Sequence, residues 1–293
     1  MELDVIEQIR DFNRFYTERL GLLTDRYLDS ERALGPSRLL WEIDGRRDVR
    51  ELQDHLGLDS GDLSRLLRDL QEEGLIRVEP HPDDGRAGIA ELTEAGRHER
   101  DTLNRRSRAR VVSLLGALDP DQQAALAAAQ NQVRMLLRLA TITIAPVAAD
   151  DPQAWRCLRQ YAAELATRFP EGYEQATLTR PEDMTGSLLL ARERDEPIGC
   201  GAWIRLGAST AEIRHLWIDN KARGLGLGRR LLRQLETDAA AHGVDTIRLG
   251  THHTLSEAIA LYRSHGYHEI DSYSDSAYNQ LCFEKHQSAR ALP

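Results

Sequence analysis

Three glycines at alternate positions constrain this chain more than any other feature of its sequence. Gly224, Gly226 and Gly228 lie in "NKARGLGLGRRLLRQLE" (residues 220–236), which follows a predicted strand and continues as a leucine-rich helical pattern. Glycine permits positive φ and lets the backbone come close to a ligand. The first turn of a helix has unpaired N–H groups and the positive end of the helix dipole. The segment therefore predicts an anion site, usually for phosphate, where the helix begins.

The spacing of the glycines departs from two common phosphate motifs. The chain lacks G-x-x-x-x-G-K-[ST] in this segment, and it lacks G-x-G-x-x-G because Arg230 and Leu231 follow Gly228 and Arg229. What remains is the pattern Arg223-x-x-Gly226-x-Gly228. Taken alone, this pattern also fits a glycine-rich turn that binds no ligand.

The pattern of the 293 residues changes near residue 140, which predicts two domains. Residues 1–140 have the periodicity of helices with one β-hairpin, "LIRVEPHPDDGRAGIAELT". From 141 onward the predicted order is a strand, helices, strands and then strand–helix pairs. We expect an all-α winged-helix domain with a β-hairpin wing over 1–140, and an α+β domain with a mixed central sheet over 141–293.

Composition narrows the location and partners of the chain. No apolar run approaches the roughly 20 residues that span a bilayer, and the N-terminus has no signal-peptide core. We therefore expect a soluble cytoplasmic protein with no membrane partner. Cys157, Cys200 and Cys282 are few and widely spaced, so we expect neither disulfides nor a metal site. The net charge of -9 opposes indiscriminate binding of nucleic acid, so DNA recognition requires a local patch.

Two motifs together make the C-terminal half resemble the GNAT acyltransferases. "RGLGLGRRLL" is similar to the coenzyme A pyrophosphate loop of that family, and "THHTLSEAIALYRSHGYHEI" is similar to its A-x-x-L-Y-x-x-x-G-[FY] signature. The signature positions in this chain are Ala258, Leu261, Tyr262, Gly266 and Tyr267. The resemblance covers about residues 141–287. It implies an N-acetyltransferase that uses acetyl-CoA as cosubstrate and acts on a primary amine by direct transfer.

The resemblance also implies how acetyl-CoA is held. Backbone N–H groups of residues 225–229 are expected to bind the pyrophosphate. Main-chain groups of residues 216–218 are expected to pair with the pantetheine arm and to polarise the acetyl carbonyl. The implied cofactor-binding residues are Leu216, Trp217, Ile218, Arg223, Gly224, Leu225, Gly226, Leu227, Gly228 and Arg229. Leu255 departs from the pattern, because many relatives carry Asn there.

The resemblance assigns two catalytic residues. Tyr262 matches the tyrosine that protonates the leaving thiolate, which requires that the phenol lie within hydrogen-bond reach. Glu212, four residues before Leu216, is the expected base, acting directly or through water. A packed aromatic and a solvent-facing strand residue are the structural alternatives for these two positions. His252 and His253 are alternative bases, since histidine titrates near neutral pH.

Two further expectations concern the acceptor side. Thr254 and Glu257 have the spacing of a capping box, so we assign Glu257 no catalytic role. The segments "ATRFPEGYEQATLTRPEDM" (residues 166–184) and "SYSDSAYNQ" (residues 272–280) are expected to border the acceptor site. No sequence rule links either segment to a substrate, and fold resemblance does not identify one.

Residues 48–97 resemble a winged helix-turn-helix, and the flanking helices resemble the MarR family of regulators. "SGDLSRLLRDLQEEG" corresponds to the recognition helix, and "PDDGR" to the wing tip, where Asp84 and Arg86 match the family's D-x-R. The resemblance implies binding to double-stranded DNA as a homodimer through the first and last helices. The candidate DNA-binding residues are Ser60, Ser64, Arg65, Arg68 and, for the minor groove, Arg86.

The charge of the N-terminal half is unfavourable for DNA. Residues 1–140 hold 21 Arg and 27 Asp plus Glu, so affinity should be modest and should fall with salt. Two alternatives therefore stay open beside an acetyltransferase fused to a regulator. In one, the chain is a transcription factor whose GNAT-like domain senses acetyl-CoA or an amine without turnover. In the other, the N-terminal half is only an oligomerisation scaffold.

Overall fold

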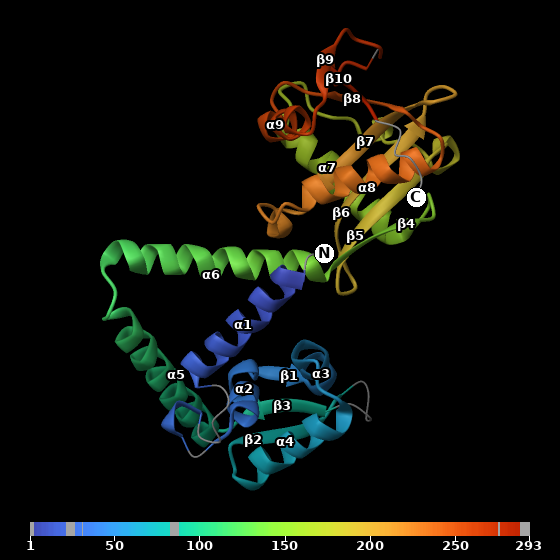
Figure 1. The fold of residues 1–293 in the computed structure, drawn as a ribbon. Coiled ribbons are helices and arrows are strands. Elements are labelled where there is room, and N and C mark those ends of the chain that lie inside the picture. The colour runs from blue at the N-terminus through green and yellow to red at the C-terminus, as the bar shows by residue number, and fades with distance from the viewer. Residues whose placement is uncertain (1–2, 22–26, 31, 83–87, 275, 288–293) are drawn as a thin grey trace. The chain divides into compact units, whose positions relative to one another are not determined.

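The computed structural model describes residues 3–21, 27–30, 32–82, 88–274 and 276–287. The chain divides into two compact units, Met1–Ala125 and Leu126–Pro293, drawn in Figure 1. The division falls inside a long helix, whereas the sequence pattern changes where that helix gives way to a strand. The predicted domain boundary at residue 140 stays a prediction. In the part of the chain that the structure describes, no helix is long and apolar enough to cross a membrane.

The first unit is helical with a small antiparallel sheet of order β1-β3-β2. Leucines from α2, α3, α4, α5 and the strands form its core. This arrangement confirms the predicted winged-helix domain with a β-hairpin. Its elements are α1 (Leu3–Leu20), α2 (Leu34–Glu42), β1 (Arg46–Asp48), α3 (Val49–Leu56), α4 (Ser60–Glu72), β2 (Ile76–Pro80), β3 (Gly88–Leu92), α5 (Glu94–Leu115) and the first turns of α6 (Pro120–Thr141).

Helix α4 takes its position from local sequence signals. Asp59 is its N-cap, and the Asp59 carboxylate accepts a hydrogen bond from the backbone N–H of Asp62. Leu63, Leu67 and Leu70 are buried. Their spacing places them on one face of the helix, and most of the polar residues on the other face are exposed.

The second unit is built on a seven-stranded sheet of order β4-β5-β6-β7-β8-β10-β9. Every pairing is antiparallel except that of β7 with β8, so the sheet is mixed, as predicted. Its elements are β4 (Ile142–Val147), α7 (Pro152–Arg168), β5 (Ser187–Glu193), β6 (Glu196–Arg205), β7 (Thr210–Ile218), α8 (Leu227–Ala241), β8 (Thr246–Thr251), α9 (Ser256–Ser264), β9 (His268–Ile270) and β10 (Leu281–His286).

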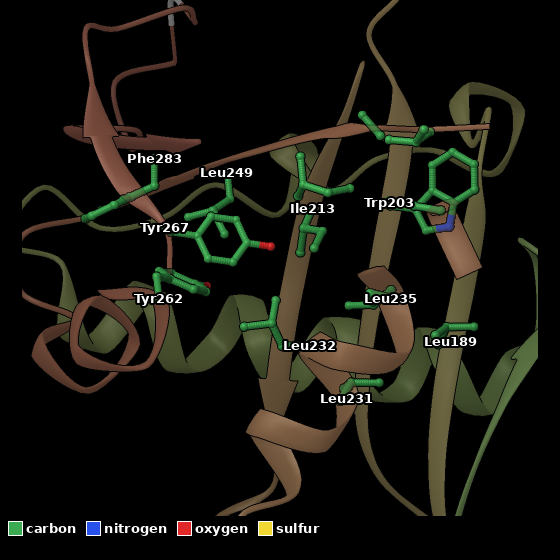
Figure 2. Packing of buried hydrophobic residues seen from close by; sticks show 14 residues of the cluster. Leu189, Trp203, Ile213, Leu231, Leu232, Leu235, Leu249, Tyr262, Tyr267 and Phe283 are labelled. Atoms are coloured by element: carbon green, nitrogen blue, oxygen red, sulfur yellow. The ribbon is translucent and has the colours of Figure 1, made fainter. Parts of the chain in front are cut away.

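Helices cover both faces of this sheet. Strand β5 alternates, with Leu189 packing in the cluster formed by α8 and α9, and with Leu188 and Leu190 packing in the cluster formed by α7. Figure 2 shows Leu231, Leu232 and Leu235 of α8 beside side chains of the strands. The sheet is therefore the middle layer, as expected for an α+β domain.

Two irregularities open the sheet at its centre. The register between β6 and β7 shifts between Cys200 and Ala202, where His215 and Leu216 of β7 face the single residue Gly201. Two residues opposite one constitute a β-bulge, which bends the strand and disrupts the ladder. In addition, the parallel pairing of β7 with β8 ends at Ile213 and Leu249. The last residues of β7 consequently lie beside a gap in the sheet.

Candidate active site

Helix α8 begins with a left-handed glycine. Gly224 has φ 77° and Gly226, the N-cap, has φ 82°, a conformation that glycine adopts without the strain of a side chain. No side chain caps the helix start, and its first turn contains no acidic residue. The first N–H groups of α8 are thus available to an anion.

A groove of about 400 Å³ runs from this helix start along the open end of β7. Its wall includes nine of the ten residues predicted to bind acetyl-CoA: Leu216, Trp217, Ile218, Arg223, Gly224, Gly226, Leu227, Gly228 and Arg229. The tenth, Leu225, instead buries its side chain in a cluster with Met135 and Leu139 of α6. A role for the Leu225 backbone N–H stays a prediction.

Ion pairs from α7 cross one wall of the groove. The Glu164 carboxylate accepts hydrogen bonds from Arg223 Nη2 at 2.5 Å and from Trp217 Nε1 at 2.9 Å. Burial raises the pKa of Glu164, but these two hydrogen bonds, the charge of Arg223 and a hydrogen bond from Arg168 together outweigh burial and lower the pKa. Arg168 pairs with Glu164 at 3.4 Å and also with Glu257 of α9. These pairs tie α7 to both the glycine loop and α9.

The last residues of α6 form hydrogen bonds with residues on both sides of the glycine loop (residues 224–228). Arg138 makes a bidentate pair with Glu193, at 2.6 and 2.7 Å, and donates to the Lys221 carbonyl at 2.9 Å. In return, Arg230 of α8 donates to the Leu139 carbonyl at 2.7 Å. No local sequence pattern indicates these contacts, because Arg138 is 83 residues away from Lys221.

A second, more enclosed pocket of about 170 Å³ adjoins the groove. The two share six lining residues: Tyr161, Leu165, Leu216, Leu255, Ala258 and Tyr262. The predicted acceptor segments contribute to the second pocket through Phe169, Tyr173, Thr177, Ser276, Tyr278 and Asn279. A ligand in the groove and one in the pocket would therefore meet at these shared residues.

Tyr262 lies where the two cavities meet. Its side chain is only 7% exposed, and burial raises its pKa to about 12, so the phenol keeps its proton at neutral pH. Its ring packs edge-on against Tyr267 with centroids 5.9 Å apart, and Figure 2 shows both rings. No hydrogen-bond partner of the Tyr262 hydroxyl lies among the described residues. The packing orients the ring, and the hydroxyl faces the junction of the two cavities with a hydrogen bond available to donate.

Glu212 lines the second pocket but is not a solvent-facing strand residue, since only 2% of it is exposed. Its carboxylate pairs with Arg214 at 2.5 Å and accepts a hydrogen bond from the Tyr273 hydroxyl at 2.9 Å. A carboxylate has about four lone-pair sites, so capacity remains for a substrate or a water molecule. These partners fix the position of Glu212 and were not foreseen from the sequence.

The alternative bases are placed differently. His252 lines the pocket and is fully buried, but both ring nitrogens are engaged. Its Nδ1 accepts from the Thr254 N–H at 3.2 Å, which leaves Nε2 as the donor to Glu171 at 3.0 Å. His253 is exposed, interacts with Gln280 and does not line the pocket.

The predicted capping box at α9 is wrong. The N-cap is Leu255, and no side chain caps the helix. The Thr254 hydroxyl instead lies 2.8 Å from His252 Nδ1. Glu257 is held by Arg168, which lowers the pKa of its carboxyl to about 2. Thr254 and Glu257 therefore interact with His252 and Arg168, respectively, and do not form the expected capping box.

Sequence reasoning missed His215 and Tyr161. His215 sits at the bulge with φ 57°, unusual for a residue other than glycine, and its Nε2 accepts the Thr179 N–H at 3.1 Å. Burial, together with Arg214, lowers its pKa to about 3, so the ring is neutral. Tyr161 lies against the His215 ring with centroids 5.6 Å apart. No local sequence pattern marks a bulge of this kind.

In the first unit, Ser60, Ser64, Arg65 and Arg68 are all exposed on α4. Arg65 pairs with Asp62 at 2.6 Å, one turn earlier. The helix therefore presents the predicted residues together, with part of their charge already neutralised. Asp84 and Arg86 of the predicted wing tip lie outside the described residues.

Two family models match the chain. Residues 153–267 match the acetyltransferase (GNAT) family, and residues 37–87 match the MarR family. The matches confirm the predicted order, with a MarR-family segment followed by a GNAT acetyltransferase domain.

Individual relatives match only parts of the chain. An IAA acetyltransferase of Azospirillum brasilense is 35% identical over 92 residues, which is 31% of this chain and 58% of the relative. An uncharacterised N-acetyltransferase of Dictyostelium discoideum is 37% identical over 62 residues, 21% of this chain and 29% of the relative. A crystal structure assigned as an acyl-CoA N-acyltransferase from Klebsiella pneumoniae is 28% identical with a TM-score of 0.44, covering 51% of this chain and 99% of that one.

Proposed function

We propose that the second unit is an N-acetyltransferase that transfers the acetyl group of acetyl-CoA directly to a primary amine. The observation that carries the proposal is the junction at Tyr262, where a groove beginning at an uncapped helix start meets an enclosed second pocket. A groove alone would fit a binding module. A second pocket at the same buried phenol supplies a place for an acceptor.

Acetyl-CoA fits the groove for physical reasons. The first N–H groups of α8 and the nearby Arg229 suit the negatively charged pyrophosphate. The bulge and the end of the β7–β8 pairing leave main-chain groups of residues 216–218 beside the groove, where an extended pantetheine arm can pair with them. An N–H group from the same segment would polarise the thioester carbonyl.

Acetyl transfer replaces the thiolate on the carbonyl carbon by the amine, and it requires that the amine lose a proton and that the thiolate gain one. The amine nitrogen attacks the thioester carbonyl carbon, and a C–N bond forms as the C–S bond breaks. Glu212, directly or through one water, accepts the proton that the amine loses. Tyr262 donates its proton to the departing thiolate. A phenol whose pKa is raised to about 12 is protonated at neutral pH, and because a thiolate is the weaker base, donation requires direct hydrogen-bond contact with the developing thiolate.

The test is thiol release from acetyl-CoA in the presence of amines, with Tyr262→Phe beside the full-length wild type. We expect amine-dependent release in the wild type and a fall in kcat of about 100-fold in the variant, with acetyl-CoA affinity retained. Tyr267→Phe is the matched control. It removes a buried hydroxyl that donates to Glu236 at 2.8 Å, outside both cavities, and should leave kcat near that of the wild type.

The other outcomes separate the alternatives. Loss of acetyl-CoA binding in Tyr262→Phe would show that the phenol only packs the pocket. Tight acetyl-CoA binding by the wild type, without release from any amine, would contradict turnover and favour a sensor.

For the first unit we propose DNA binding by a homodimer that regulates transcription, as the MarR-family match suggests. Helix α1 supports the dimer, since it exposes large apolar side chains with helical spacing: Val5, Ile6, Ile9, Phe12, Phe15 and Tyr16. Such a surface on one helix is typical of a protein interface. Sedimentation of the full chain should show a dimer. Phe12→Asp with Phe15→Asp should yield monomers, and a dimer that survives both changes would contradict this interface.

A further inference from the structure

The second pocket, which we call the acceptor pocket, is rich in aromatic residues although the chain has few of them. The sequence contains 4 Trp, 8 Tyr and 4 Phe among 293 residues. Nearly a third of them line this one pocket of about 170 Å³: Tyr161, Phe169, Tyr173, Tyr262 and Tyr278. The rings come from α7, the segment after it, α9 and the segment between β9 and β10. Such convergence of distant segments indicates a surface built for a ligand.

The rings form a continuous wall. Phe169 stacks on His252 with centroids 4.1 Å apart and planes at 22°, and on Tyr278 at 5.8 Å and 28°. Tyr278 also lies 4.7 Å from Tyr173, which contacts Tyr161 edge-on at 5.9 Å. Each ring is held by neighbours, so the wall is assembled before a ligand enters.

The wall offers little for a second charged group on the ligand. Among its described residues, the charged side chains are Glu212 and Arg214, which pair with each other at 2.5 Å. The His215 ring is held neutral, and both nitrogens of His252 are engaged. A substrate carboxylate would have to share Arg214 with Glu212, whose negative charge would repel it. A second ammonium group would have to be desolvated without a dedicated partner.

From the aromatic wall, the internal charge pairing and the small volume, we infer that the acceptor is a monoamine carrying a single aromatic ring and no carboxylate. This inference rests on the proposed acetyltransferase function. An apolar cavity of about 150 Å³ in another protein holds one benzene molecule, so the present pocket has room for one ring. The ring packs against Phe169 and Tyr278, and the amine reaches toward Glu212 and Tyr262.

The test compares amines that differ in one feature each, using the full chain and saturating acetyl-CoA. The panel is 2-phenylethylamine, phenylalanine (the same ring and amine with a carboxylate), spermidine, and a peptide with one free lysine amine. We expect kcat/KM for 2-phenylethylamine to exceed that of each other amine by about tenfold or more. An equal or higher value for any of the other three would overturn the inference while the acetyltransferase proposal stands. No release from any amine would overturn both.

Variants of Tyr278 test the wall itself. Tyr278→Ala removes a ring that is only half buried, so the fold should tolerate the change. We expect it to lower kcat/KM for 2-phenylethylamine by about tenfold, mainly through KM, with unchanged acetyl-CoA affinity. Tyr278→Phe keeps the ring and loses only the hydroxyl that accepts the Glu174 N–H at 3.3 Å, so it should keep the wild-type preference for 2-phenylethylamine. If Tyr278→Ala matched the wild type, the aromatic wall would not bind the acceptor.

Discussion

Two helix starts in this chain are expected to meet phosphate, and they are built differently. Helix α8 begins at Gly226 in the left-handed conformation, without a side-chain cap and without an acidic residue in its first turn. Helix α4 begins at Asp59, whose carboxylate accepts the Asp62 N–H at 2.8 Å. Asp62 in turn pairs with Arg65. The start of α8 has no side-chain cap, whereas the start of α4 has one that satisfies a backbone N–H within the protein.

The difference teaches that a helix dipole alone does not define a phosphate site. Both helices have the same positive end, but at α4 the Asp59 carboxylate already caps it, and Asp62 adds a second negative charge in the first turn. The hydrogen bond from the Asp62 N–H is the main cause that lowers the pKa of Asp59, so this carboxylate is charged at neutral pH. DNA bound by α4 must therefore rely on side chains farther along, such as Arg68. Acetyl-CoA at α8 would rely on the backbone itself.

The largest effect should come from Gly226→Val, which tests the backbone site at α8. Valine at φ 82° is strongly disfavoured, so the loop must change shape and its N–H groups move away from the pyrophosphate. Losing two charge-assisted hydrogen bonds, each contributing about 1.5–3 kcal/mol, should weaken acetyl-CoA binding at least about 100-fold in titration calorimetry.

Gly243→Val is the matched control for that variant. Gly243 has φ 79° at the other end of α8, with no neighbouring atom within 4 Å of an added Cβ, and it lies outside the groove. It should lose stability in a comparable way while acetyl-CoA affinity is kept. Equal affinity losses in the two variants would show that strain, rather than position, explains the effect.

A smaller effect is expected from Arg138→Ala, which removes support behind the same loop. The Lys221 carbonyl loses its donor and Glu193 loses its partner, so the loop samples more conformations before it binds. We expect acetyl-CoA affinity to fall about fivefold, with kcat nearly unchanged. Arg134→Ala, one turn earlier and hydrogen-bonded to Asn131 of its own helix, should match the wild type. An unchanged affinity in Arg138→Ala would mean that the loop holds its shape unaided.

Asp59→Asn tests whether the negative charge at the start of α4 weakens DNA binding. Asparagine is an equally good N-cap, so α4 should persist while its start loses one negative charge. Affinity for duplex DNA in a gel-shift assay should rise about threefold at low salt, and less at high salt because the added attraction is screened. No change at low salt would indicate that this end of α4 does not face DNA.

The smallest effect should come from Arg65→Ala. Arg65 is exposed and already paired with Asp62, so contacting a phosphate exchanges one ion pair for another. We expect DNA affinity to fall by less than about threefold, and by less than in Arg68→Ala. A tenfold loss on Arg65→Ala would show that the pair with Asp62 opens fully on DNA.

The same contrast explains how much the sequence could predict. The groove was predictable because most of its wall comes from residues 216–229, which are continuous in the chain and carry the glycine pattern that the family resemblance relies on. The winged helix was predicted from the resemblance of residues 48–97 to a winged helix-turn-helix, and these residues are likewise continuous in the chain. In both cases the prediction depends on residues that are close together in the sequence.

The acceptor pocket was not predictable beyond its two bordering segments. Its wall joins Tyr161 to Tyr278, and the stacking partner of Phe169 is His252, 83 positions away along the chain. The positive φ of His215 depends on a bulge that only the paired strand reveals. The capping box at α9 failed because Glu257 is drawn to Arg168 on another helix. In each case the conformation or the contacts of the residue depend on partners that are distant in the sequence.

The most direct test of the central claim is amide hydrogen exchange of the full chain, with and without saturating acetyl-CoA. If the start of α8 holds the pyrophosphate through its backbone, exchange in residues 224–230 should slow on binding, while the start of α4 at residues 59–65 stays unchanged. Saturated binding with unaltered exchange in residues 224–230 would contradict the account, because the phosphate groups would then be held elsewhere.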